Sequence, residues 1–175
     1  MSTLLDLFRR VADLERRLNV SNLRGTVHSV DAAAGTVRLD LGPDDAGGRL
    51  LSPPVPYAQQ AGALKVHAPP STGQQMTIVS PSGDLAAGVA QPLSWSSSES
   101  SPSQNGAENM LTFGDVSILL TESGVTITVG GSSVQLTANG LAVTSSAMTH
   151  NGTNVGATHV HSGVQSGPAK TSTPE

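Results

Sequence analysis

Two histidines separated by a single residue are the clearest candidates for chemistry in this chain. His159 and His161 lie in the stretch "GATHVHSGVQSGPAKTSTP", and the whole chain of 175 residues contains only five histidines. In an extended segment, residues i and i+2 project to the same side, so both imidazoles can face one point while Val160 faces away. Imidazole is a good ligand for Fe, Zn, Ni and Cu, so this spacing indicates a metal site.

One chain supplies two imidazoles, whereas three chains around a threefold axis would supply six. Six nitrogen ligands suit an octahedral transition-metal site and argue against the tetrahedral habit of structural zinc. A fully occupied octahedron leaves no position for substrate, so such a metal would tie chain ends together rather than catalyse. The alternative is that both histidines are simply solvated in a polar tail. His150 has no histidine at i±2 and is interpreted as a strand or turn residue outside the site.

Catalysis is not expected from these residues. A catalytic metal centre normally adds a carboxylate or a third histidine, yet the only acidic residue after Glu122 is the terminal Glu175. No nucleophile motif, P-loop or glycine-rich dinucleotide turn is present. We therefore expect that the protein is not an enzyme.

The composition favours β-structure and excludes several classes of partner. Nineteen glycines and eleven prolines indicate turns and short strands. The net charge of −4, with few clustered cations, makes nucleic acid an unexpected partner. The absence of cysteine removes disulfides and thiolate ligands. No apolar run approaches the roughly 18 residues that span a bilayer, and the charged N-terminus is unlike a signal peptide, so we expect a soluble protein made in the cytoplasm.

Residues 1–20 are predicted to form an amphipathic helix. Its apolar residues fall at heptad positions a, d, a, d and a: Leu4, Leu7, Val11, Leu14 and Leu18. Either the helix packs on its own domain or it forms a short coiled coil. Two heptads are too few to be stable alone, so a coiled coil would need help from elsewhere in the molecule.

Residues 21–95 are predicted to form a small antiparallel barrel of the OB-fold type. About five alternating stretches are separated by Gly, Pro and Asp turns: "LRGTVHSV", "GTVRLDL", "LKVHAP", "QQMTIVSP" and "AAGVAQPL". Oligonucleotide-binding sites on such barrels use basic grooves and stacked aromatic residues, which this segment lacks. We therefore expect the barrel to be a structural platform rather than an oligonucleotide-binding module. His28 and His67 are interpreted as ordinary strand residues.

The C-terminal half is predicted to be repetitive. A Ser-rich linker over residues 96–109 leads into residues 110–157, where Val116, Val125, Val134 and Val143 recur every nine residues between glycine turns. The turns lack the Asp that a calcium-binding roll requires. In a single chain, one apolar face of these strands would be exposed to water. Three copies wound around a common axis would cover it.

In this order, these features resemble the central spike proteins of contractile phage tails, the baseplate assembly protein V family. The resemblance extends over nearly the whole chain and rests most on "SPSGDLAAGVAQPLSW" and "THVHSGVQSGPAKTSTP". It implies a homotrimer in which an OB-fold leads into an intertwined triple-stranded β-helix with a pointed apex, here residues 158–175. It also implies one iron ion on the threefold axis, held by His159 and His161 of each chain.

The function that this resemblance implies is mechanical. The protein would be a virion component at the tip of the tail baseplate, bound to baseplate hub and tail tube proteins, and sheath contraction would drive it through the bacterial outer membrane. Two alternatives remain. One is a binding or adaptor module, in which the OB-fold recognises sugar or a baseplate subunit; the other is a short tail-fibre adhesin, although no aromatic residue follows Phe113 to build a receptor surface.

Overall fold

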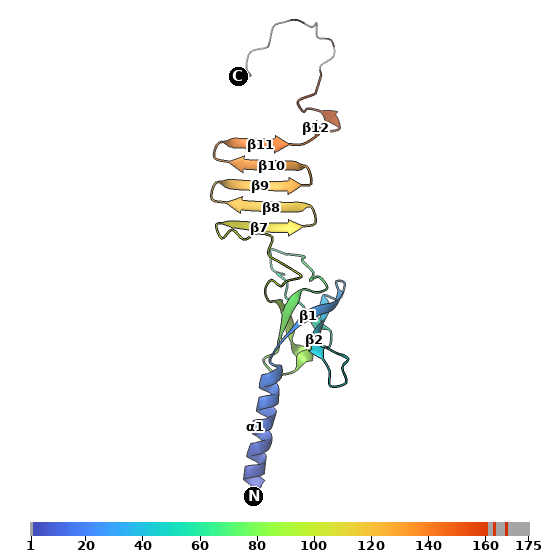
Figure 1. The fold of residues 1–175 in the computed structure, drawn as a ribbon, viewed down its shortest axis with the longest axis vertical. Coiled ribbons are helices and arrows are strands. Elements are labelled where there is room, and N and C mark those ends of the chain that lie inside the picture. Colours follow the sequence, from blue (N-terminus) through green and yellow to red (C-terminus); the bar gives the residue numbers. More distant parts are fainter. Residues whose placement is uncertain (1, 161–162, 164–166, 168–175) are drawn as a thin grey trace. The chain divides into compact units, whose positions relative to one another are not determined.

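The described part of the chain has one N-terminal α-helix, and most of the regular structure after it consists of β-strands (Figure 1). This computed structural model describes residues 2–160, 163 and 167. The chain divides into two compact units, residues 1–101 and residues 102–175. The prediction of a mainly β protein with a short N-terminal helix is confirmed.

Helix α1 (Ser2–Val20) is amphipathic, but the first unit does not cover its apolar side. Between residues 3 and 19, every side chain except that of Asp13 is exposed. The five apolar heptad residues are 43–73% exposed. The alternative in which this helix packs its apolar side on its own domain is therefore wrong, because no strand of the first unit lies against that side.

Only the last turn of α1 is fixed to the rest of the first unit. The amide of Ser80 donates to the carbonyl of Ser21, just after the helix, at 2.8 Å. A Cβ built on Gly83 would lie 2.7 Å from the Cα of Arg17, and Gly83 has φ +74°. Gly83 thus lets the 80–84 turn approach the helix backbone, which a residue with a side chain could not do without displacing one of them.

Six antiparallel strands form the sheet of the first unit. Their bounds are β1 (Asn22–Asp31), β2 (Thr36–Pro43), β3 (Arg49–Leu51), β4 (Val55–Pro56), β5 (Gln75–Val79) and β6 (Val89–Pro92), with a short 3₁₀ helix at Leu85–Ala87. The order is β3-β2-β1-β5-β6, and β4 also pairs with β2. A parallel bridge between Tyr57 and Ala90 links β6 to the end of β4, so the sheet closes on itself.

The closed sheet surrounds a small apolar core. Its buried members come from β1, β2, β4, β5 and β6 and from Tyr57, just after β4: Val27, Val37, Leu39, Val55, Tyr57, Met76, Ile78 and Ala90. Two serines are also buried, and both make hydrogen bonds. Ser52 Oγ accepts from the Leu39 amide at 2.9 Å, and Ser80 Oγ donates to the carbonyl of Asp84 at 2.5 Å. These bonds attach irregular segments to the sheet. A hydrophobic residue at either position could not do so, because its side chain cannot hydrogen-bond to the buried backbone groups.

One predicted strand of this unit is absent. Four of the five predicted stretches correspond to β1, β2, β5 and β6, but residues 64–69 form no strand beyond a single bridge at Lys65. His67 therefore lies outside any strand, whereas His28 lies in β1, where the register with β2 shifts. Residues 64–69 alternate but remain exposed, because β4 and Tyr57 already fill the position beside the core.

The second unit contains a five-stranded antiparallel meander. Its strands are β7 (Glu108–Phe113), β8 (Val116–Thr121), β9 (Gly124–Val129), β10 (Ser132–Thr137) and β11 (Gly140–Thr144), in spatial order β11-β10-β9-β8-β7 (Figure 1). Two-residue turns join them. Gly114 and Gly130 occupy the first turn position with φ of +55° and +54°, where a hairpin turn requires positive φ. The strands begin every eight residues, at 108, 116, 124, 132 and 140. The valines that recur every nine residues therefore lie one position further along each successive strand, on the same face of the sheet.

The meander has one apolar face and one polar face. Cross-strand partners share a face of a sheet, and the register places Ile118 opposite both Leu111 and Ile127, and Val134 opposite both Ile127 and Val143. We call this side the apolar face; its members are Leu111, Phe113, Val116, Ile118, Leu120, Val125, Ile127, Val129, Val134, Leu136, Leu141 and Val143. The opposite side consists mainly of Ser and Thr. Within the described second unit, no further layer covers either face.

Strand pairing in the meander is completed within one chain. Each of β8, β9 and β10 has its sequence neighbours on both sides, so only β7 and β11 have an open edge among residues 108–144. In this chain the repeat folds as a meander whose apolar face, rather than its strand edges, carries most of the uncovered surface.

Candidate metal centre at the C-terminal hairpin

A short hairpin positions the first of the two candidate ligands. Strands β12 (Thr149–His150) and β13 (Thr153–Asn154) pair, with Thr149 opposite Asn154. The turn between them is Asn151-Gly152, with φ of +48° and +80°, the sequence and dihedral signs of a tight two-residue hairpin. The amide of Val155 continues the ladder by donating to Met148 at 2.9 Å. His150 lies in β12, as predicted for a strand or turn residue.

The side chain of Asn154 organises the residues that follow the hairpin. Its Oδ1 accepts from the Gly156 amide at 2.9 Å, and its Nδ2 donates to Thr158 Oγ1 at 3.2 Å. An Asn side chain that bonds to the backbone two residues on forms an Asx turn, which reverses the chain locally. Both the oxygen and the nitrogen of the Asn154 side-chain amide therefore hold the segment immediately before His159.

The imidazole of His159 is held by the carbonyl of Gly156. That oxygen accepts the His159 amide at 3.0 Å and lies 2.6 Å from the ring Nδ1. A carbonyl oxygen can only accept, so Nδ1 must carry the proton. In the neutral ring the lone pair is then on Nε2, which is the nitrogen that can bind a metal. A backbone carbonyl on the other ring nitrogen is a common way to orient a histidine ligand.

The second candidate ligand, His161, lies outside the described residues, so its position relative to His159 stays a prediction. Among residues 2–160, 163 and 167, no three His, Asp or Glu side chains come together in one chain as a metal site would require. Sequence reasoning found the histidine spacing but missed Asn154 and Gly156. The signal was present as "NVGATH", in which an Asn precedes a Gly by two residues.

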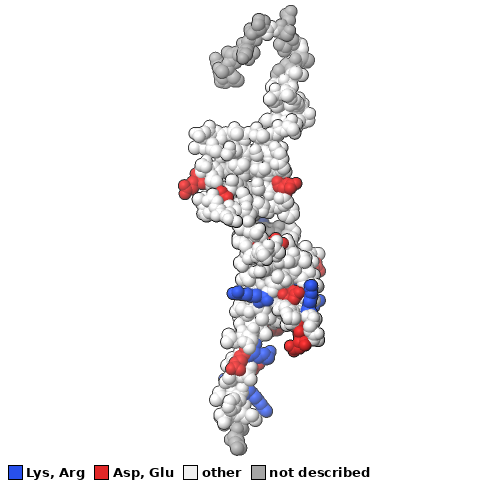
Figure 2. Space-filling model, viewed as in Figure 1, with Lys and Arg blue, Asp and Glu red and all other residues white. Residues whose placement is uncertain are grey.

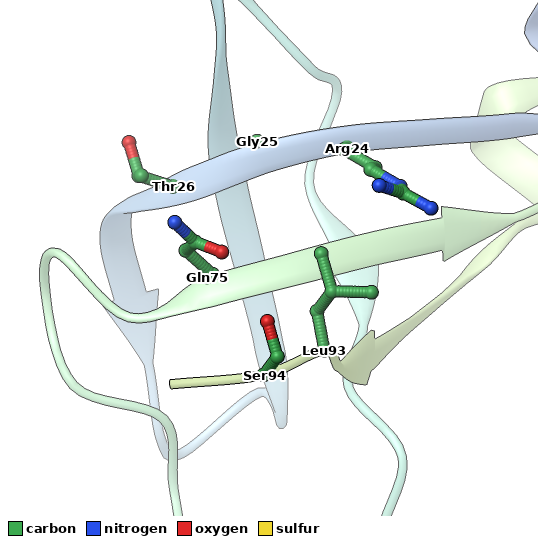
Figure 3. Close-up of a pocket in the computed structure, with 6 residues that line it drawn as sticks. All are labelled: Arg24, Gly25, Thr26, Gln75, Leu93 and Ser94. Atoms are coloured by element: carbon green, nitrogen blue, oxygen red, sulfur yellow. The ribbon is translucent and has the colours of Figure 1, made fainter. Parts of the chain in front are cut away.

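The first unit has a surface pocket whose lining contains no histidine (Figure 3). It has a volume of about 480 Å³ and lies between β1, β5 and the segment after β6. Its lining residues are Arg24, Gly25, Thr26, Gln75, Leu93 and Ser94. Arg24 is the only charged residue among them, and none is aromatic. This lining has no pair of acid and base groups, and no stacking surface for a sugar or a base.

Comparisons with known proteins add no relative. No protein-family model matches the chain, and no curated protein matches it. Among the described residues, no helix combines the length and the apolar character needed to cross a membrane.

Proposed function

We propose that this protein is the central spike of a contractile tail or a related injection device, a homotrimeric needle that is driven through the envelope of a bacterial cell. The observation that carries the proposal is the apolar face of the meander. It consists of twelve residues that no layer of the described second unit covers. A single sheet of this kind is unstable in water and prone to associate.

Three copies of the meander would cover one another if each apolar face pointed toward a common axis. The side chains of that face are mostly Val, Leu and Ile, which suit a narrow shared core. The open edges at β7 and β11 would then pair with neighbouring chains. We further propose that this assembly is an intertwined trimeric β-helix, and that the closed sheet of the first unit is an OB-fold bound by hub and tail tube proteins.

The charge distribution of the chain is consistent with passage through an envelope. No Lys or Arg occurs between Lys65 and Lys170, and the described second unit carries only Glu108, Asp115 and Glu122 as acidic residues (Figure 2). Moving charged side chains into lipid is costly. A needle whose outer face is mainly Ser and Thr lowers that cost while remaining soluble before use.

In this proposal, His159 and His161 of three chains hold one metal ion near the tip, and iron is the metal that the family resemblance implies. The donor set fits, because imidazole is a good ligand for iron and the Gly156 carbonyl leaves Nε2 of His159 as the ligating nitrogen. When bound, the metal supplies a cross-link between three chain ends that have little hydrophobic surface. The chain itself orients the imidazole through the Asn154 turn.

The trimer is tested by the mass of the full chain in solution. Three chains of 17.7 kDa give a particle of about 53 kDa. Light scattering coupled to size exclusion should find this mass at micromolar concentration. A monomer would contradict the proposal, because a needle of one sheet would leave the apolar face in water.

The metal is tested by elemental analysis of the same sized particle. We expect one iron per three chains, and loss of that iron in the double variant His159→Ala, His161→Ala. The control is His28→Ala, His67→Ala, which removes two histidines of the first unit and should leave the metal content unchanged. Unchanged iron in the tail variant would locate the metal elsewhere.

A binding module is the second candidate, and the pocket beside Arg24 is the observation that favours it. This second candidate function predicts that His159 and His161 are dispensable and that the five-stranded sheet of the second unit is only a spacer. The double variant His159→Ala, His161→Ala separates the two functions. If the second unit is only a spacer, the protein should keep its mass, stability and metal content in this variant.

A further inference from the structure

Helix α1 has an apolar stripe that the rest of the first unit leaves exposed. Leu4, Leu7, Val11, Leu14 and Leu18 form the stripe, and Phe8, itself 64% exposed, lies beside it. The spacing alternates between three and four residues, which keeps the stripe on one side of a helix that packs lengthwise against another helix. The stripe is therefore shaped for a parallel or antiparallel helical partner rather than for a sheet.

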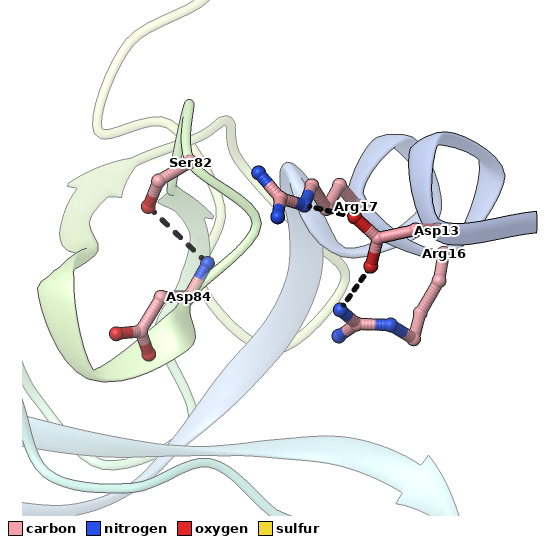
Figure 4. A network of polar contacts seen from close by, with 5 residues as sticks. All are labelled: Asp13, Arg16, Arg17, Ser82 and Asp84. Atoms are coloured by element: carbon pink, nitrogen blue, oxygen red, sulfur yellow. Dashed lines mark hydrogen bonds and ion pairs between the residues drawn. The ribbon is translucent and has the colours of Figure 1, made fainter. Parts of the chain in front are cut away.

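The charges beside the stripe distinguish between these two directions. Asp13 binds Arg16 at 2.7 Å and Arg17 at 2.8 Å within the same helix (Figure 4). Arg10 and Glu15, at heptad positions g and e, have no ion pair among the described residues. In parallel helices in register, position g of one helix faces position e of the next heptad in its neighbour, which places Arg10 beside Glu15 of another copy.

An antiparallel pair of these helices would not place opposite charges beside each other in this way. Positions g then face each other, and Arg10 and Arg17 both occupy position g, so like charges would meet. Within one helix, residues 10 and 15 are five positions apart and do not face each other. The opposite charges of Arg10 and Glu15 can therefore pair only between two copies of the helix.

We propose that α1 is a second self-association surface of this protein, a parallel coiled coil in which Arg10 of each copy pairs with Glu15 of the next. The number of copies, three, rests on the proposed function. A helix of only about two heptads is too short to associate alone. When the sheets hold the chains together, the helices are at a high effective concentration, and a short coiled coil can form.

Single-cysteine variants of the full chain test the parallel arrangement, because the protein has no cysteine of its own. In Leu7→Cys the thiol is at position d, where copies of a parallel coiled coil meet. In Arg9→Cys it is at position f, which faces away from the partner. With a short bis-maleimide, we expect Leu7→Cys to couple pairs of chains many-fold faster than Arg9→Cys. Equal rates in the two variants would overturn the inference.

Charge reversal tests the pairing of Arg10 with Glu15 without any change in the apolar stripe. Arg10→Glu and Glu15→Arg should each lower the temperature at which the far-ultraviolet helix signal is lost, since each places like charges together. Combining the two reversals restores opposite charges between copies, so the double variant should recover most of the shift. A double variant that melts no higher than the lower of the two single variants would overturn the pairing.

The mass of the particle separates this inference from the proposed function. A 53 kDa trimer in which Leu7→Cys couples no faster than Arg9→Cys would overturn the coiled coil and leave the spike intact. A dimer that couples rapidly through Leu7→Cys would support the coiled coil and overturn the trimeric spike. A monomer would overturn both.

Discussion

At the scale of single residues, the chain uses small polar side chains to fix backbone segments that have no regular structure. The side chain of Asn154 bonds to Gly156 and Thr158 ahead of His159, and the hydroxyl of Ser80 donates to the carbonyl of Asp84 within the 80–84 turn. In each case the side chain satisfies backbone or hydroxyl groups that strands cannot reach. Such contacts decide where a functional residue points, since a lone imidazole on an exposed segment has little packing to restrain it.

Asn154→Ala should weaken metal binding although Asn154 is not a ligand. Losing both bonds frees the segment before His159, and removal of groups that orient a ligand typically costs about 10–100-fold in affinity. Competition against a chelator measures the change. Asn139→Ala is the matched control, because that Asn also lies in a turn of the second unit but its side chain makes no hydrogen bond in the described structure. Equal affinities in the two variants would contradict the role of Asn154.

Asp13 should make helix α1 sensitive to acid. The hydrogen bond from Arg16, followed by the charge of Arg17, holds the pKa of Asp13 below its ordinary value of 3.8. A lowered folded pKa means that the stabilisation is present above the unfolded pKa and is lost as the pH falls through the folded one. Helix content followed by circular dichroism should therefore decline below about pH 4.

The variant Asp13→Asn should lack this part of the acid transition, because its side chain does not ionise. Asp6→Asn is the control: Asp6 is in the same helix but forms no ion pair among the described residues. If both variants titrate like the unmodified chain, Asp13 does not contribute to the pH dependence of α1.

At the scale of elements, turns and bridges set how the helix and sheets are built. The two-residue turns, two of which begin with Gly114 and Gly130, shape the repeat into a meander with most of its apolar residues on one face. The bridge between Tyr57 and Ala90 closes the first sheet around its core. The close approach of Gly83 to Arg17 sets where α1 leaves that unit.

Gly83→Ala should destabilise the first unit by about 1–3 kcal/mol, since it adds both a positive-φ penalty and a contact with the helix backbone. Denaturant unfolding measures the difference. Gly47→Ala is a matched control, because Gly47 has φ +80° but a Cβ added there would have nothing within 4 Å. A larger loss at Gly83 than at Gly47 isolates the contact with α1, and equal losses would show that this contact does not constrain the turn.

At the scale of the whole molecule, the apolar face and the apolar stripe of α1 have the same consequence. Each unit presents a set of hydrophobic residues that its own described residues leave exposed: the stripe of α1 in the first unit and the apolar face of the meander in the second. Burial of apolar area is the main favourable contribution to folding and association. We therefore expect the stability of this chain to depend on its concentration, as it does for proteins that fold as they assemble.

Ile127→Asp should disrupt the assembly, whereas Thr126→Asp should not. Ile127 lies at the middle of the apolar face, between Ile118 and Val134, and the neighbouring Thr126 lies on the polar face. A buried unpaired carboxylate is strongly destabilising, and the same group in water is not. Light scattering should find a smaller particle for Ile127→Asp and an unchanged one for Thr126→Asp. Similar masses for both variants would contradict burial of the apolar face.

The sequence by itself determined the elements that depend on local pattern. The heptad spacing of Leu7 and Leu14 specifies a helix, and nine-residue spacing with glycine turns specifies short strands with one apolar face. These patterns are local because a residue's face in a helix or strand follows from its position alone. The spacing of His159 and His161 could likewise be read without any knowledge of the fold.

Only the tertiary structure decided which segments meet. It closed the first sheet through Tyr57 and Ala90, left residues 64–69 outside the sheet, and placed Asn154 and Gly156 as the supports of His159. It also showed that the first unit does not cover the stripe of α1. Periodicity reveals that a face is apolar but not what covers it, because the partner is chosen by contacts between residues that are distant along the chain.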